Sequence, residues 1–97
     1  MPKYVVLYKF TEQGAQQMKS LPERSRAAAA ALEQAGGKLL GWYLTEGQYD
    51  VVTVVETPDE NTMAVGALAI ATAGNSRPET LRAFDLNEAE QLIQRIP

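Results

Sequence analysis

One stretch in the middle of the chain decides the fold: KLLGWYLTEGQYDVVTVVET, residues 38–57. Its two halves, 38–45 and 49–57, are rich in β-branched and aromatic residues, which is typical of strands. Between them Glu46-Gly47-Gln48 supplies a short turn, so the two strands are predicted to form a β-hairpin. Pro58 ends the second strand because it has no N–H to donate.

The residues before the hairpin predict a strand and a main helix. Tyr4–Phe10 alternates aromatic and β-branched side chains and is predicted to be the first strand. Thr11 is expected to cap a short helical segment over Glu12–Lys19. Ser20 and Glu23 have the spacing of a capping box, with Pro22 in the first turn of a main helix over 21–34. Gly36-Gly37 should end that helix, with one glycine in the left-handed region.

The residues after the hairpin predict a second helix, a last strand and a terminal helix. Asp59 is expected to cap a helix over 60–73, which Gly74-Asn75 closes. A short strand over 80–84 follows, and Asn87 is expected to cap an amphipathic terminal helix. The order β-α-β-β-α-β plus a helix predicts one α+β domain over 1–97, a ferredoxin-like sandwich. The small residues on both main helices favour close packing on the sheet.

The strands are apolar on both faces. Tyr4, Val6, Tyr8 and Phe10 are expected to point one way and Val5 and Leu7 the other, and in 51–55 valines occur at both odd and even positions. In the second strand we expect Leu40, Trp42 and Leu44 to oppose Leu39 and Tyr43. Because the two helices cover only one face, we expect the other face to pack on a second copy of the chain. Alternatively, the terminal helix folds back over this face, although it is long enough to cover only part of it.

Several short motifs, in order along the chain, resemble the GYD domain family. They are Tyr4-Val5-Val6-Leu7 leading to Phe10-Thr11, Ser20-x-Pro22-Glu23-Arg24, Gly36-Gly37-Lys38, Gly47-Gln48-Tyr49-Asp50-Val51-Val52, Gly74-Asn75-x-Arg77-x-Glu79-Thr80 and Arg82-Ala83-Phe84. The namesake motif occurs here as Gly-x-Tyr-Asp. The resemblance spans nearly the whole chain, and implies a small bacterial protein with a dimeric α/β-barrel assembly, in which two sheets pack face to face. It implies no particular chemistry.

The composition narrows the classes of function. Nine basic residues face twelve acidic ones, for a net charge of −3, and the basic residues are scattered, which argues against nucleic acid as a partner. The chain has no cysteine and no histidine, so thiol chemistry, axial haem ligation by histidine and most metal sites are disfavoured. We therefore expect no metal and no cofactor. No stretch is long and apolar enough to span a bilayer and no signal-like segment opens the chain, so a cytoplasmic location is expected.

Seven polar or aromatic residues are candidates for a binding site: Tyr8, Arg24, Trp42, Tyr49, Asp50, Asn75 and Arg77. Asp50 is out of place beside a run of branched residues. It either lines a small pocket with Asn75 and Arg77, or it caps the turn or pairs with an arginine to fix the register. Asn75 similarly either ends a helix or helps to bind an anion. The aromatic residues suit a ligand pocket as well as a subunit interface.

Three kinds of function remain open. The first is a homo-oligomeric module that binds a small metabolite or a partner protein without catalysis. The second is a cofactor-independent oxygenase or isomerase that uses a pocket near the Gly47–Asp50 hairpin, with Tyr8, Tyr49 and Asp50 as acid–base candidates. A tautomerase-like role for Pro2, after removal of Met1, is a weaker form of this idea. The third is a regulatory protein that responds to a ligand at subunit interfaces.

Overall fold

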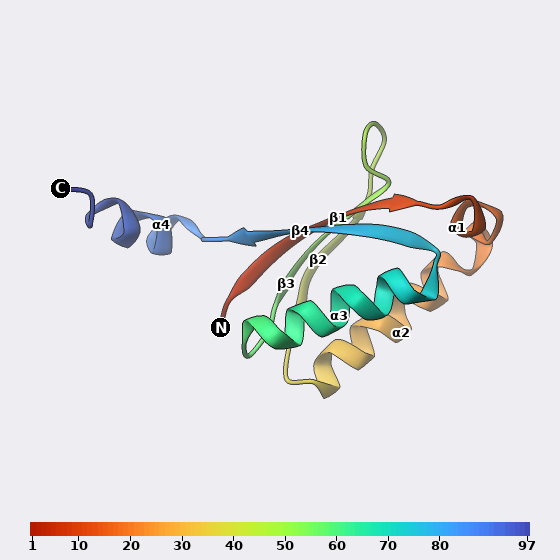
Figure 1. Ribbon diagram of the computed structural model, residues 1–97, viewed down its shortest axis with the longest axis horizontal. Helices are drawn as coiled ribbons and strands as arrows, with labels where there is room; N and C mark the ends of the chain where they lie inside the picture. Colours follow the sequence, from red (N-terminus) through yellow and green to blue (C-terminus); the bar gives the residue numbers. More distant parts are fainter.

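The computed structural model describes all residues, Met1–Pro97, and confirms a mixed α+β architecture (Figure 1). The elements in order are β1 (Lys3–Phe10), α1 (Glu12–Gln16), the 3-10 turn η1 (Met18–Ser20), α2 (Leu21–Gln34), β2 (Lys38–Leu44), β3 (Val51–Glu56), α3 (Glu60–Ala73), β4 (Ser76–Ala83) and α4 (Leu86–Ile93). The predicted ferredoxin-like order is consistent with this arrangement.

The four strands form one open antiparallel sheet in the order β2-β3-β1-β4. In Figure 1, α2 and α3 lie on one side of this sheet and no helix lies on the other. Alternate residues of each strand therefore point to the helix side or to the uncovered side. Tyr4, Val6, Val51 and Val55 are buried on the helix side, while Val5, Leu7, Val52, Val54, Leu81 and Tyr43 lie on the uncovered side, which we call the open face.

A β-bulge in β2 changes the expected face of one residue. Leu39 lies opposite Val55 and Gly41 lies opposite Val54, so Leu40 is an extra residue without a partner on β3. The prediction that Leu39 and Trp42 oppose each other is therefore wrong, because the extra residue brings both to the helix side of the sheet. Plain alternation could not reveal this, because a bulge is a local departure from the two-residue period.

The N-terminal helices differ from the prediction at their junction. Thr11 caps α1 as expected, since its hydroxyl accepts a hydrogen bond from the Gly14 amide. However, α1 ends at Gln16 and η1 replaces its predicted last turn. The Ser20 capping box is also wrong: the hydroxyl donates to the Gln17 carbonyl and accepts from Nε of Arg24 instead. Helix α2 has the predicted bounds, and Gly36 after it is left-handed.

The second half of the chain has one strand that is longer than predicted. Asp59 caps α3 through the Thr62 amide, and Gly74 closes it in the left-handed region, both as predicted. Strand β4 begins at Ser76 rather than at position 80 and pairs with β1 along eight residues. Pro78 hid this start, but β4 is an edge strand, where a proline's missing N–H does not break the sheet.

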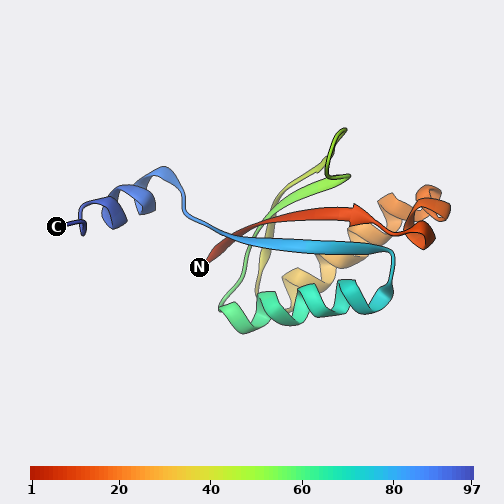
Figure 2. The same cartoon turned by 45° about the horizontal axis from the view of Figure 1, so that its top comes forward.

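Helix α4 projects away from the rest of the molecule (Figures 1 and 2). Its cap is Asp85 rather than the predicted Asn87: the Asp85 carboxylate accepts from the Glu88 amide, and the Glu88 carboxylate accepts from the Asp85 amide. The ammonium group of Lys3 lies 3.3 Å from Glu88 and 3.5 Å from Asp85. The hydrogen bond to Glu88 raises the pKa of Lys3.

Because α4 projects away from the rest of the molecule, the alternative in which this helix folds back over the open face is wrong for a single chain.

The core of the single chain is small. Tyr4, Val6, Val55 and Met63 form its buried centre, with Leu32 and Leu39 among the residues packed around it. Many large apolar side chains remain exposed, including Tyr43, Leu44, Val65, Leu68 and Ile93. No helix has the length and apolar character that crossing a bilayer requires.

Candidate functional site

An apolar groove lies between the helices and the sheet, and we call it the helix-side groove. Its volume is about 880 Å³. β1 and β3 form the floor, and α2 and α3 form the two walls (Figure 2). Ala28 and Ala31 of α2 and Ala35, its C-cap, line the groove and are exposed. The expected close packing of this small-residue face on the sheet is therefore wrong. A groove of this size and lining suits an apolar side chain or a small molecule.

The floor of the groove carries two hydroxyl groups in contact. The phenol oxygen of Tyr8 lies 3.3 Å from Oγ1 of Thr53. Burial raises the pKa of Tyr8, and the hydrogen bond with Thr53 opposes this shift in part. The phenol therefore stays protonated at neutral pH, and the pair offers a hydrogen-bonding point in an apolar surface. Thr53 was not a predicted site residue, although a threonine within the run of valines in β3 is a visible signal.

Three further predicted residues line the same groove: Arg24, Trp42 and Asn75. Arg24 is half-buried and donates to the hydroxyl of Ser20 and to the Gln17 carbonyl. Asn75 accepts a hydrogen bond from the side chain of Gln13. Helix α3 is closed by Gly74 and not by a left-handed Asn75, because no residue other than glycine has positive φ. Together with Tyr8, the groove thus gathers four of the seven predicted residues.

Asp50 is tied to the backbone of the neighbouring strand. Its carboxylate accepts a hydrogen bond of 2.8 Å from the amide of Phe10, and its own amide donates to the carbonyl of Tyr8. Its carbonyl accepts from the amide of Thr45 across the hairpin. The carboxylate thus binds the backbone at the end of β1, and it neither caps the turn nor has an arginine partner. The expected cluster of Asp50, Asn75 and Arg77 is not assembled in the groove, since only Asn75 lines it.

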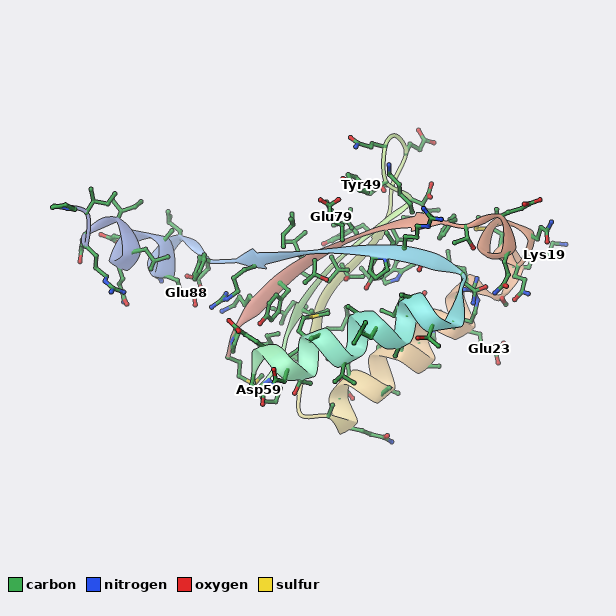
Figure 3. The ribbon with its side chains drawn as sticks, in the orientation of Figure 1. Lys19, Glu23, Tyr49, Asp59, Glu79 and Glu88 are labelled. Atoms are coloured by element: carbon green, nitrogen blue, oxygen red, sulfur yellow. The ribbon has the colours of Figure 1, made fainter.

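Tyr49 and Arg77 belong to the opposite side of the sheet. The phenol of Tyr49 donates to the Glu79 carboxylate over 2.6 Å, and Figure 3 shows the two side chains above the sheet, away from the helices. The hydrogen bond to Glu79 raises the pKa of Tyr49. The ammonium group of Lys9 lies 5.4 Å from the centre of the Tyr49 ring, and Lys9 pairs with Arg77 across the strands. Sequence reasoning missed Lys9 and Glu79 because their proximity depends on the register of β4.

The chain has two unfilled apolar surfaces, the helix-side groove and the open face. The groove offers hydrogen bonding at Tyr8 and Thr53 and a cation at Arg24. The open face has the apolar Val5, Leu7, Val52 and Val54 on its two central strands. On its edge strands Leu81 is 43% and Tyr43 62% exposed. No group of three or more acidic side chains is placed to hold a metal ion. Both surfaces are suited to recognition.

Comparison with known proteins identifies the family of the chain. The family model described as the GYD domain matches residues 4–93. A relative from Thermus thermophilus is 36% identical over 97 residues, which cover 99% of this chain and 99% of the relative. That relative is named as a glutamine synthetase and cystathionine beta-lyase binding protein. No solved structure matches the chain. The predicted resemblance is thus confirmed, and the chain belongs to the GYD domain family.

Proposed function

We propose that this protein is a homo-oligomeric binding protein that associates with metabolic enzymes through the helix-side groove. The class of partner comes from the relative, which is named for binding glutamine synthetase and cystathionine beta-lyase and matches along the whole chain. The single structural observation that carries the proposal is the groove itself, an exposed apolar channel with few polar groups. We also propose that the protein is located in the cytoplasm.

The pairing of copies is the second part of the proposal and rests on the open face. Val5, Leu7, Val52 and Val54 lie on a side of the sheet that no helix of the same chain covers (Figure 1). Large apolar patches on a small domain usually mark an interface. Two copies packed face to face would bury these patches and leave both grooves on the outside, free to bind enzymes.

Binding to purified enzymes tests the role of the groove. Ala31 lines the groove on α2, whereas its neighbour Ala30 is exposed and does not line it. We expect the wild-type chain to bind glutamine synthetase or cystathionine beta-lyase from its own organism in titration calorimetry. The substitution Ala31→Trp should fill the groove and weaken binding at least tenfold, or about 1.4 kcal/mol, whereas Ala30→Trp should not.

Two results would overturn this proposal. If neither enzyme binds the wild-type chain at micromolar concentration, the class of partner is wrong. If both tryptophan variants bind as well as wild type, the partner does not use the groove. Circular dichroism of both variants separates either result from a folding defect.

A small metabolite is a second candidate occupant, and the Tyr8–Thr53 pair favours it. A hydrogen-bonding pair in an apolar floor orients a ligand that has one polar group. Such a ligand would raise the melting temperature by mass action, and Tyr8→Phe should reduce the shift. A metabolite screen without any shift would eliminate this candidate. Asp50 and Tyr49, two acid–base candidates of the enzyme alternative near the hairpin, are both engaged in hydrogen bonds within the fold.

A further inference from the structure

The helix-side groove has a charged side chain at each of its ends. Of the side chains that line it, only those of Arg24 and Asp59 are charged. Arg24 lies near the start of α2, and Asp59 caps the start of α3. The two helices run in opposite directions, so α2 begins at the end of the sheet where α3 finishes (Figures 1 and 2). The groove therefore has a positive end at Arg24 and a negative end at Asp59.

Arg24 is the one of these two charges that the chain leaves without compensation. The Asp59 carboxylate accepts hydrogen bonds from the amide and the hydroxyl of Thr62, as the cap of a helix does. Arg24 is half-buried and donates only to neutral oxygens, those of Ser20 and Gln17, and it forms no ion pair. A partly buried cation without a counter-charge is costly, so this end of the groove favours an anionic ligand.

The hydrogen bonds of Arg24 leave one edge of its guanidinium group free. Nε donates to the hydroxyl of Ser20 over 2.9 Å, and Nη2 donates to the carbonyl of Gln17 over 3.2 Å. These two donors form one edge of the group. The other edge, formed by Nη1 and the second N–H of Nη2, has no partner in the chain. Two parallel N–H groups match the two oxygens of a carboxylate, and the bonds to the preceding turn fix their orientation in advance.

Two more hydrogen-bond donors lie at the same end of the groove. Asn75 follows the end of α3, and its side-chain oxygen accepts from Gln13, which leaves its NH₂ group free to donate. Tyr8 lies near the end of β1, and Thr53 can donate in their shared hydrogen bond, which leaves the phenol hydrogen for a ligand. The only acidic side chain of the groove is at the opposite end. The polar groups at the Arg24 end therefore suit an anion.

The remainder of the groove is long and apolar. From Arg24 to Ala35, α2 and its C-cap line one wall over about 16 Å, at a rise of 1.5 Å per residue. Gly66 and Ala69 are among the small residues of α3 on the other wall. A channel of this length suits an extended hydrocarbon chain better than a compact ring. Asp59 at the far end would repel a second anionic group, so the ligand carries its charge at one end only.

We propose that the helix-side groove binds an amphipathic carboxylic acid with an unbranched apolar tail. Its carboxylate pairs with the free edge of Arg24, beside Asn75, and its tail extends along the groove toward Asp59. The inference rests on the groove of the proposed function and names the chemical class of its small ligand. Because a partner enzyme would use the same groove, the bound acid would compete with it.

Titration with a matched pair of probes tests the role of the carboxylate. Trp42 is the one tryptophan of the chain and lines the groove, so its fluorescence reports occupancy. We expect decanoate to bind the wild-type chain about tenfold more tightly than decanol, which has the tail without the charge. Arg24→Gln should remove this difference. Arg26→Gln changes the net charge equally at an exposed position outside the groove and should keep the difference.

The comparison of the two probes on the wild-type chain is decisive without any variant. If decanol binds as tightly as decanoate, or if neither changes the fluorescence of Trp42 at millimolar concentration, the inference is wrong. An equal loss of decanoate affinity in both arginine variants would also overturn it, because the acid would then respond to overall charge and not to Arg24. The melting temperature of each variant shows whether it is folded.

Binding of the enzymes is measured separately, so the two proposals fail independently. If an enzyme binds the wild-type chain and decanoate does not, the carboxylic acid is wrong and the enzyme partner stands. If decanoate binds through Arg24 and neither enzyme binds, the class of partner is wrong and the ligand stands.

Discussion

Asp50 illustrates at the scale of one residue how a charge within an apolar run can serve the backbone. Its carboxylate accepts from the Phe10 amide where β1 ends and the hairpin returns. We predict that Asp50→Ala lowers the free energy of unfolding by about 1–2 kcal/mol, because a half-buried amide loses its partner. Asp50→Asn should lose less, since its amide oxygen still accepts this bond.

Urea unfolding at neutral pH measures both Asp50 variants. Equal losses in the alanine and asparagine variants would show that the negative charge matters rather than the hydrogen bond.

Asp59 gives a pH prediction at the same scale. Its carboxylate accepts from the backbone and side chain of Thr62, which lowers its pKa below the ordinary 3.8. A lowered folded-state pKa gives stability that is present above the unfolded-state pKa and is lost as the pH falls through the folded-state pKa.

The variant Asp59→Asn still caps the helix but does not titrate. We therefore expect its urea midpoint to fall less than that of wild type between about pH 6 and about pH 3. If the urea midpoints of wild type and Asp59→Asn fell by the same amount across this range, protonation of Asp59 would not be coupled to its contacts with Thr62.

At the scale of elements, α1 depends on a glycine that lies against the end of α3. Gly14 is buried, and a methyl group there would collide with the carbonyl of Asn75. We predict that Gly14→Ala is destabilising by about 2 kcal/mol or more, as overpacking against backbone usually is. Gly66 in α3 faces open space, so Gly66→Ala should stabilise by about 0.5–1 kcal/mol through helix propensity. The melting temperatures of the two variants, compared with wild type, test both predictions. A change of the same sign in both variants would contradict the packing described for Gly14.

The sequence predicted most elements because their signals are local. Thr11, Asp59 and Gly74 mark helix ends by their own chemistry, and the structure uses each of them. The errors occur where the deciding contact is distant or alternative caps compete. Asp85 rather than Asn87 caps α4 because Glu88 completes its capping box and Lys3 joins it from the other end of the chain.

The residues of the candidate site divide in the same way, into those predicted from local signals and those that depend on distant contacts. Tyr8, Arg24, Trp42 and Asn75 were predicted one by one from residue type, and the fold brings them to one groove. The Tyr49–Glu79 contact and the placement of Arg77 on the other side follow from the pairing register of β1 with β4. That register was hidden by Pro78, so residue types alone could not assign these groups to separate surfaces.

At the scale of the whole molecule, two adjacent residues of β4 test the open face. Leu81 lies on the open face, and Thr80, exposed as well, points to the helix side. We predict that Leu81→Lys shifts the chain toward monomers at micromolar concentration, because a charge would be buried between two apolar sheets. Thr80→Lys should keep the oligomer of wild type. Native mass spectrometry or sedimentation measures both, and an unchanged oligomer in Leu81→Lys would argue against pairing through this face.

The bulge at Leu40 has a consequence for how this chain tolerates insertion and deletion during evolution. Because Leu40 has no partner on β3, its removal would leave Leu39 opposite Val55 and Trp42 opposite Thr53. The loss of a residue between Gly41 and Leu44 would instead move side chains between the groove and the open face. Position 40 is therefore where β2 can change length by one residue while each surface keeps its composition.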